Sequence, residues 1–386
     1  MNVLAPIDAA ANAWDMSPLG PGLADRTPTP SSVIDIGPQR NVHRYKLPRA
    51  PSAHSPVLLV PPLAAPARCF DLRRGCSVAE HLISLGYPTY LVDYGPIAFA
   101  DRQLGLEHWV EDVIPNAIDA VRRDAGGDCD VQLVGWCLGG IMSLLSLAGD
   151  RSLPVSSIAL IASPFDFGKV RGAAPIRQLA ELTGGRVVTA LYQALGGAPA
   201  PLVSLGFQLT ALDKRITKPL TVLRNLHDRE MLAHIEAVDD YMAHMLAYPG
   251  RTFGQLYHRF FRVNDLADGR IELDDGKAID VADVTVPVLV VAGANDILAP
   301  REAVHHVADL LTGAPDVRVF TAKGGHLGVL TGRGARHETW RHLDAFLRDY
   351  DRRRTGELPA PAAWIPSPSS SRPARASAPS RARAPS

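Results

Sequence analysis

The chain has 386 residues, of which 46% are hydrophobic and 21% charged, a composition typical of a globular protein with ample material for a core. Its 40 basic residues balance its 40 acidic residues, so no overall field attracts nucleic acid, and we expect no such partner. The four cysteines are too few for a disulfide framework, and no ligand spacing indicates a metal, so we expect no cofactor. The start of the sequence lacks the features of a secretory signal, which favours a cytoplasmic setting with free thiols.

Strand and helix signals alternate along the first half of the chain. Apolar runs that indicate strands are followed by stretches with helical periodicity. The expected strands are 57–63, 88–94, 131–136 and 156–163, and the expected helices are 77–87, 106–123 and the residues after 137. This alternation predicts a mostly parallel, doubly wound sheet with helices on both faces.

The alternation stops near residue 164 and resumes at the apolar strand 284–296. The intervening 164–283 has mainly helical patterns and is expected to be an inserted cap. Its stretch 187–212 carries no charge and has the length of a membrane span, but the sequence GGAPAP divides it into two short apolar pieces. These pieces are either core helices of the cap or an apolar lid that covers an active site or meets lipid.

A helix at 301–311, a strand at 317–322 and a helix at 335–350 complete the expected sheet. The predicted core therefore comprises 31–163 and 284–352. Residues 1–30 are expected to be disordered. So is the tail 353–386, which is dominated by Pro, Ser, Ala and Arg and cannot build a core.

The sequence GWCLG places Cys137 between Gly135 and Gly139, where an expected strand meets an expected helix. It matches the GxSxG nucleophile elbow with sulfur in place of oxygen, and the glycines give room around a strained turn. The following helix N-terminus favours a thiolate. Cysteine is also a common buried residue, so the match alone leaves a structural role open.

Two further residues follow later expected strands in the chain order that such an elbow requires. Asp296 follows the strand within 284–296, and His326 lies in the sequence GGHLG after the strand 317–322. Asp93 is an alternative acid in a displaced arrangement. The remaining candidate histidines are expected to be surface or packing residues: His227, His234, His244, His305 and His306.

Backbone N–H groups are expected to bind the oxyanion of a tetrahedral intermediate. The N–H of Leu138 follows the nucleophile directly. The second donor is expected from the loop after the first core strand, where either Leu63 or Ala64 supplies it, because the two preceding prolines have no N–H.

Several motifs together resemble the poly(3-hydroxyalkanoate) synthase group of α/β-hydrolase-fold proteins. They are GWCLGGIMSLL, the PPL near the first strand, GANDILAP, GGHLG, Trp340 and LYHRFFRVNDLADG, and the likeness covers roughly 55–350. The resemblance implies an α/β-hydrolase fold and a catalytic triad of Cys137, Asp296 and His326. It also implies polymerisation of 3-hydroxyacyl-CoA, and either a second synthase subunit or a homodimer.

A thiol suits such a donor, because exchange of one thioester for another costs little free energy and leaves the acyl group activated. The alternatives are a hydrolase with the same triad, namely an esterase, lipase, depolymerase or thioesterase, and a non-catalytic protein that binds polymer or lipid. Water must be kept from an acyl-cysteine, so four apolar cap residues are expected to line or cover the substrate entrance: Leu191, Leu195, Leu205 and Phe207. The protein is then expected in the cytoplasm, either free or at a polymer or lipid granule surface.

Overall fold

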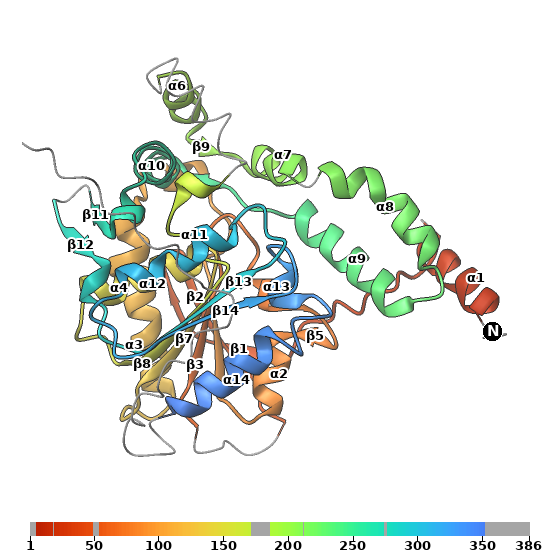
Figure 1. Ribbon diagram of the computed structural model, residues 1–386, viewed down its shortest axis with the longest axis horizontal. Coiled ribbons are helices and arrows are strands. Elements are labelled where there is room, and N and C mark those ends of the chain that lie inside the picture. The colour runs from red at the N-terminus through yellow and green to blue at the C-terminus, as the bar shows by residue number, and fades with distance from the viewer. Residues whose placement is uncertain are drawn as a thin grey trace, which may run out of the picture.

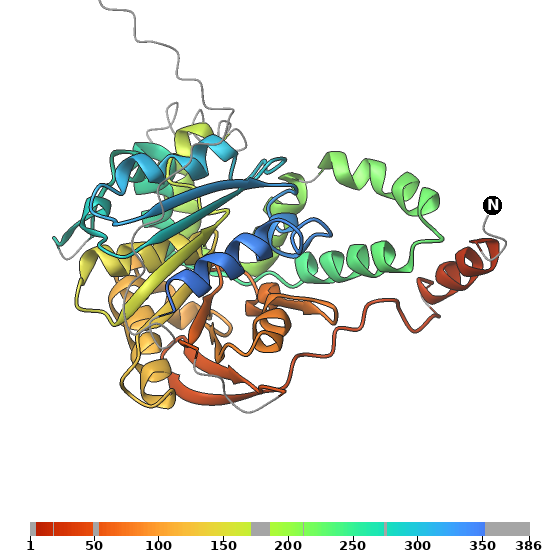
Figure 2. The same ribbon diagram turned by 60° about the horizontal axis from the view of Figure 1, so that its bottom comes forward.

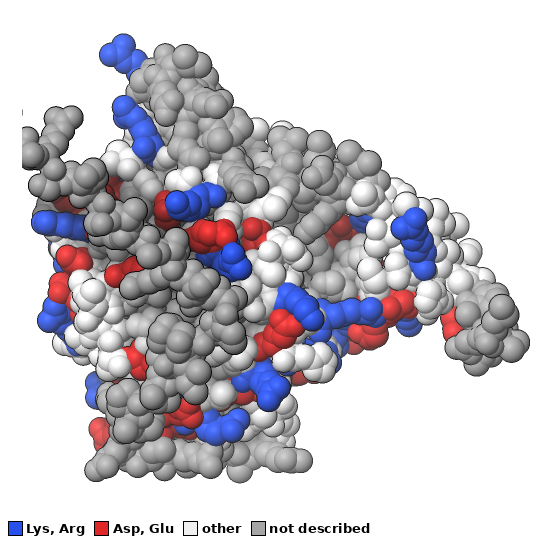
Figure 3. Space-filling model, viewed as in Figure 1, with Lys and Arg blue, Asp and Glu red and all other residues white. Residues whose placement is uncertain are grey.

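The computed structural model describes residues 5–17, 19–48, 54–170, 186–210, 212–273 and 276–351. A twisted sheet forms the centre of the molecule, helices cover both of its faces, and a helical arm extends to one side (Figures 1 and 2). Lys and Arg side chains lie beside Asp and Glu side chains on the face seen in Figure 3 rather than in one broad basic region.

The sheet has the strand order β1-β2-β6-β3-β7-β8-β13-β14. All neighbours from β6 to β14 pair in parallel, which confirms the predicted mostly parallel sheet. The strands β3, β7, β8 and β13 are buried along their whole length, as the continuous apolar runs require. The strands of this sheet are β1 Ser31–Gly37, β2 Arg40–Tyr45, β3 Val57–Val60, β6 Thr89–Asp93, β7 Val131–Trp136, β8 Val155–Ile161, β13 Val288–Gly293 and β14 Val317–Ala322.

An antiparallel hairpin, β1 and β2, extends the sheet at the β6 edge, and the sequence analysis named no strand there. Val42 of β2 pairs with Val92 of β6 and is fully buried, whereas most of β1 is partly or fully exposed. An edge hairpin of this kind carries polar residues on its open side and therefore lacks a continuous apolar run.

The core helices lie near where the periodicity placed them, but a short helix Gly328–Thr331 was not expected, the expected helix 335–350 begins only at Thr339, and two other expected helices differ in form. The expected helix 106–123 begins as a π-helical segment, His108–Val113, and becomes α-helical where Pro115 occupies the first turn of α3. The expected helix 301–311 is interrupted at His306. The core helices are α2 Val78–Ser84, α3 Ile114–Asp124, α4 Leu138–Gly149, α11 Arg301–His305, α12 Val307–Leu310, α13 Gly328–Thr331 and α14 Thr339–Asp349. Short strands β4 Asp71–Arg73 and β5 Cys76–Ser77 pair beside α2.

Between β8 and β13 the chain leaves the sheet and forms mainly helices, with two small ladders that the sequence did not predict. One ladder pairs β9 Gly197–Ala198 with β10 Tyr248–Pro249, and the other pairs β11 Arg270–Glu272 with β12 Ala278–Asp280. The GGAPAP sequence does interrupt the uncharged stretch, because β9 separates α6 from α7. The helices are α6 Arg186–Leu195, α7 Ala200–Thr210, α8 Leu212–Arg224, α9 Arg229–Ala243 and α10 Gly250–Gln255, followed by a π-helical segment Leu256–Val263.

The prediction that residues 1–30 are disordered is wrong for much of that segment. Residues Ala5–Asp15 form helix α1, which lies at the tip of the arm beside α9 (Figure 2). The side-chain amide of Asn12 donates to the Leu226 carbonyl at 2.7 Å, and Asp15 pairs with Arg229 at 2.6 Å. These tertiary contacts stabilise a helix that is too short to persist alone. The predicted disordered tail 353–386 lies outside the described residues.

None of the helices in the described ranges combines the length and the apolar character that crossing a membrane would require.

Candidate active site

Cys137 occupies the tight turn between β7 and α4, with φ of 55° and ψ of −124°. A non-glycine residue adopts such angles only where its surroundings impose them. Its N–H is held by the carbonyl of Ile161 at 2.9 Å. A Cβ at Gly135 would lie 2.4 Å from the Gly140 Cα, and one at Gly139 would lie 2.3 Å from the Val60 carbonyl oxygen. Both glycines are therefore needed for the turn to fit against its neighbours, and the thiol remains partly exposed.

Asp296 and His326 form a buried pair at the carboxyl ends of β13 and β14. The Nδ1–H of His326 donates to Oδ2 of Asp296 at 2.8 Å. The other carboxylate oxygen accepts the backbone N–H groups of Leu298 and Ala299, each at 2.9 Å. Because these bonds fix the carboxylate, and the carboxylate fixes the ring, Nε2 of His326 is left for a second partner. The Cys137 side chain lies near this ring, close enough for its charge to raise the pKa of His326.

The electrostatics of this group favour a protonated imidazole. Burial of His326 acts to lower its pKa, but the neighbouring Cys137 and Asp296 charges, with the hydrogen bond to Asp296, outweigh burial and raise the pKa of His326 to about 10. The arrangement therefore stabilises the imidazolium that forms when the histidine accepts a proton from the thiol.

Trp136, the residue before the nucleophile, holds the histidine loop, and the sequence analysis did not identify it. Its indole N–H donates to the carbonyl of His326 at 3.2 Å, and the two rings lie 5.1 Å apart. The tryptophan beside the nucleophile in GWCLG could have indicated this contact, because a buried indole N–H needs a hydrogen-bond acceptor nearby. The contact couples the position of the imidazole to the elbow itself.

The loop after β3 lies directly against the elbow, where the second oxyanion donor was expected. Ala64 has a positive φ of 58°, and its carbonyl accepts the N–H of Leu246, which ties this loop to the segment after α9. Within the described residues the N–H groups of Leu63 and Ala64 form no backbone hydrogen bond, and Leu138 opens α4, where an N–H has no partner inside the helix. The choice between Leu63 and Ala64 stays a prediction.

Three residues not anticipated as neighbours of the nucleophile lie near it: Cys69 and Tyr241 are buried, and Tyr248 is half-buried. Burial raises the pKa of Cys69, of Tyr241 and of Tyr248, and the Cys137 charge adds to each increase. The Tyr241 ring lies 6.5 Å from that of Trp136, and only 1% of the Tyr241 surface is exposed. A low-polarity wall thus covers one side of the thiol.

The other sequence candidates do not join this group. The Asp93 carboxylate accepts the N–H of Gly95 at 3.0 Å, while His326 is bound to Asp296, so the displaced acid is not the partner of the histidine. Three of the remaining histidines bond to backbone carbonyls of their own surroundings: His244 to Asp240, His305 to Phe320 and His306 to Ala267.

The four apolar cap residues divide into two groups. Leu191, Leu195 and Leu205 are 56%, 40% and 49% exposed, so they are not core residues of the described structure. Phe207 is half-buried and packs against the main core. Their role in covering the substrate entrance stays a prediction.

Comparison with known proteins identifies a matching family and similar proteins. The model of a family described as protein of unknown function (DUF3141) matches residues 55–346. A Haloferax mediterranei protein named poly(3-hydroxyalkanoate) polymerase subunit PhaC is 25% identical over 332 residues, which are 86% of this chain and 66% of that protein. The protein of the same name from Allochromatium vinosum is 26% identical over 313 residues, or 80% of this chain and 85% of that protein.

The chain spans less than two thirds of the length of the Haloferax protein and of its Haloarcula marismortui counterpart, of which it covers 62%. Among solved structures, one titled "Lipase (Open form)" superposes with a TM-score of 0.52 at 14% identity, covering 83% of this chain and 98% of that one. This likeness concerns the fold, and it agrees with the sheet order and the elbow in identifying an α/β-hydrolase fold.

Proposed function

Since the chain belongs to the DUF3141 family, and is an α/β-hydrolase-fold protein related to the poly(3-hydroxyalkanoate) synthases, we propose that it is a cysteine-dependent acyltransferase acting on 3-hydroxyacyl-CoA. The observation that carries the proposal is the thiol of Cys137 in a strained elbow, near a histidine that a buried carboxylate orients.

In the first step, Sγ of Cys137 attacks the thioester carbonyl while His326 takes the thiol proton. The carbonyl oxygen becomes an oxyanion, for which the N–H groups of Leu138 and of Leu63 or Ala64 are the donors. When the intermediate collapses, the bond to the CoA sulfur breaks and His326 returns the proton to the departing thiolate. The acyl group is then a thioester of Cys137.

In the second step, the hydroxyl of another 3-hydroxyacyl group gives its proton to His326 and attacks the acyl-cysteine. A new ester bond forms, and the cysteine leaves as a thiolate that recovers the proton. Asp296 keeps the imidazole in the required tautomer in both steps and stabilises its protonated form. Because the first step exchanges one thioester for another, sulfur serves this reaction better than serine oxygen does.

A hydrolase is the second candidate, and the partial exposure of Cys137 favours it. If water reaches the acyl-cysteine, the same proton transfers by His326 release a free acid instead of an ester. Closure of the apolar cap against water then decides between the two reactions.

The proposal extends to partners. The curated relatives are named as polymerase subunits, so we propose that this chain works with either a second synthase subunit or a second copy of itself. Exposed leucines of the cap supply apolar surface for that contact, or for a polymer or lipid granule: Leu191, Leu195, Leu202, Leu205, Leu220 and Leu223.

The test is incubation of the purified chain with 3-hydroxybutyryl-CoA. Free CoA release is followed in time, and the acyl product is identified by mass spectrometry. Oligomer or polymer supports the acyltransferase, and free 3-hydroxy acid supports the hydrolase. Both candidate functions would be contradicted if the protein, shown by circular dichroism to be folded, released no CoA and formed no acyl product from several 3-hydroxyacyl-CoAs.

A further inference from the structure

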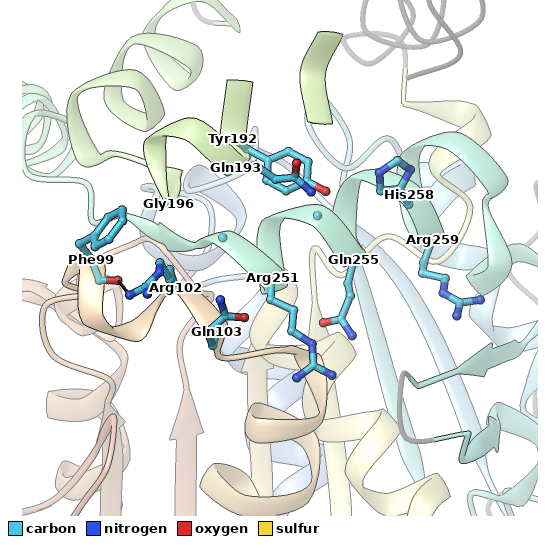
Figure 4. A pocket seen from close by; sticks show the side chains of 12 residues that line it. Phe99, Arg102, Gln103, Tyr192, Gln193, Gly196, Arg251, Gln255, His258 and Arg259 are labelled. Atoms are coloured by element: carbon cyan, nitrogen blue, oxygen red, sulfur yellow. Dashed lines mark hydrogen bonds between the residues drawn. The ribbon is translucent and has the colours of Figure 1, made fainter. Parts of the chain in front are cut away.

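A pocket of about 550 Å³ lies between the cap and the core, apart from the Cys137 group (Figure 4). Its walls come from the short 3₁₀ helix Phe99–Gln103 of the core and from α6, α10 and the π-helical segment of the cap. Neither Cys137, Asp296 nor His326 lines it. The volume is sufficient for a small organic ligand.

The lining of this pocket is cationic and polar. Three arginines, Arg102, Arg251 and Arg259, line it together with His258, and no carboxylate is among its lining residues. The acidic partners lie outside the lining: Arg251 pairs with Glu107, and Arg259 lies 3.6 Å from Asp265. Amide side chains of Gln103 and Gln193 also line the pocket, whereas the amide of Gln255 is bonded to Leu106 and Glu107.

Of the three arginines that line the pocket, Arg102 is the one for which the described structure gives no ion pair. Its guanidinium donates to the Phe99 carbonyl at 3.2 Å and lies 4.6 Å from the centre of the Phe99 ring. Across the described ranges no carboxylate forms an ion pair with it. A guanidinium with spare N–H groups and no carboxylate partner matches the geometry and charge of a phosphate group.

Aromatic contacts connect this pocket to the surroundings of the nucleophile. Tyr248 lies close enough to Cys137 for the charge of the thiolate to act on it. The Tyr248 ring is 5.9 Å from that of Phe253, which in turn is 5.7 Å from Tyr192 in the pocket wall. The N–H of Leu246 also bonds the carbonyl of Ala64, in the loop that lies against the elbow, and Gly250 of the pocket wall follows four residues later. At most about 14 Å of extended chain separates Leu246 from Gly250, a span that the long pantetheine arm of CoA bridges.

We propose that this arginine-lined pocket binds the phosphorylated end of the acyl-CoA, with Arg102 as its main phosphate contact, while the pantetheine arm carries the thioester to Cys137. This inference rests on the proposed acyl-CoA substrate. It assigns recognition of the nucleotide end to residues outside the catalytic group, so that the cap segment 186–263 contributes to substrate selection.

The kinetic test compares two donors with the same acyl group, 3-hydroxybutyryl-CoA and its N-acetylcysteamine thioester, which has no phosphate. We expect Arg102→Gln to raise KM for the CoA donor about tenfold, the effect of one lost charge-assisted contact, and to leave the short donor unchanged. The matched control is Arg122→Gln, at an exposed arginine of α3 that does not line the pocket. An equal effect of Arg102→Gln on both donors, or no effect on either, would overturn the proposal.

If the wild type turns over neither donor, that result counts against the proposed function. The pocket can then still be tested by measuring binding. Calorimetry with the Cys137→Ala protein should detect binding of CoA and of ADP. Adding Arg102→Gln to that protein should weaken the affinity for both ligands by about tenfold. Pantetheine should bind the two proteins equally. Binding of inorganic phosphate without binding of CoA or ADP would identify a plain anion site and contradict the proposal.

Discussion

Replacing Asp296 by Asn removes the charge that orients and protonates His326 while nearly preserving the shape of the side chain. The carboxylate is fully buried and makes one bond to the imidazole and two to backbone N–H groups. The amide oxygen of asparagine can keep the backbone bonds, but its NH₂ group cannot accept the Nδ1–H. The change therefore favours the wrong tautomer of the imidazole while the loop stays in place.

The size of the effect follows from the raised pKa of His326. A change from 6.5 to about 10 corresponds to about 5 kcal/mol in favour of the imidazolium, and Asp296 supplies one of the two charges responsible. Loss of about half of this is about 2 kcal/mol, and the wrong tautomer costs more, so we expect Asp296→Asn to reduce kcat by about 10³-fold to 10⁴-fold. The pKa of His326, measured by NMR, should fall.

The assay is steady-state release of CoA from 3-hydroxybutyryl-CoA, together with the rate at which iodoacetamide alkylates Cys137. The matched control is Asp93→Asn, which alters the other acid considered from the sequence and should leave both rates unchanged. Full activity of Asp296→Asn, or a comparable loss in Asp93→Asn, would refute the assignment of the acid.

Three further substitutions test other parts of the account. Cys137→Ser should lose transfer from thioesters while keeping slow ester hydrolysis, measured with p-nitrophenyl esters, and undiminished transfer would contradict the need for sulfur at this position. Leu205→Asp should raise the ratio of free acid to transferred product with an unchanged melting temperature, because the side chain is 49% exposed, and a melted, inactive variant would count against the lid. His234 has a pKa lowered to about 4, first by burial and then by Arg73 and Arg333, so its neutral form contributes stability above about pH 6.5 that is lost as the pH falls toward 4. Measured by urea unfolding, the free energy of unfolding should fall less over that pH range in His234→Gln than in the wild type. Identical dependence on pH in the two proteins would contradict this.

The parallel part of the sheet could be predicted because its inner strands β3, β7, β8 and β13 are buried on both faces and appear in the sequence as continuous apolar runs. The Cys137, Asp296 and His326 positions could also be predicted, since each follows such a strand and parallel strands end at one edge of the sheet. Gly135 and Gly139 marked the elbow because no larger residue fits between α4 and the loop after β3.

Other features depend on contacts that the local sequence does not contain. The edge hairpin β1–β2 has no continuous apolar run, and α1 is held by Leu226 and Arg229, more than two hundred residues away. The arginine-lined pocket brings Arg102 and Arg251 into one lining because the Thr252 N–H bonds the Leu104 carbonyl across the fold. None of these follows from periodicity or composition.

The central claim is that Cys137 carries the acyl group between donor and acceptor. The most direct measurement is the intact mass of the protein after brief mixing with 3-hydroxybutyryl-CoA and acid quenching, followed by peptide mapping. The account predicts one added 3-hydroxybutyryl group, located on Cys137, released by hydroxylamine and absent from Cys137→Ala. Release of CoA with no adduct at any time point, or an adduct on Cys69, Cys76 or Cys129 instead, would contradict it.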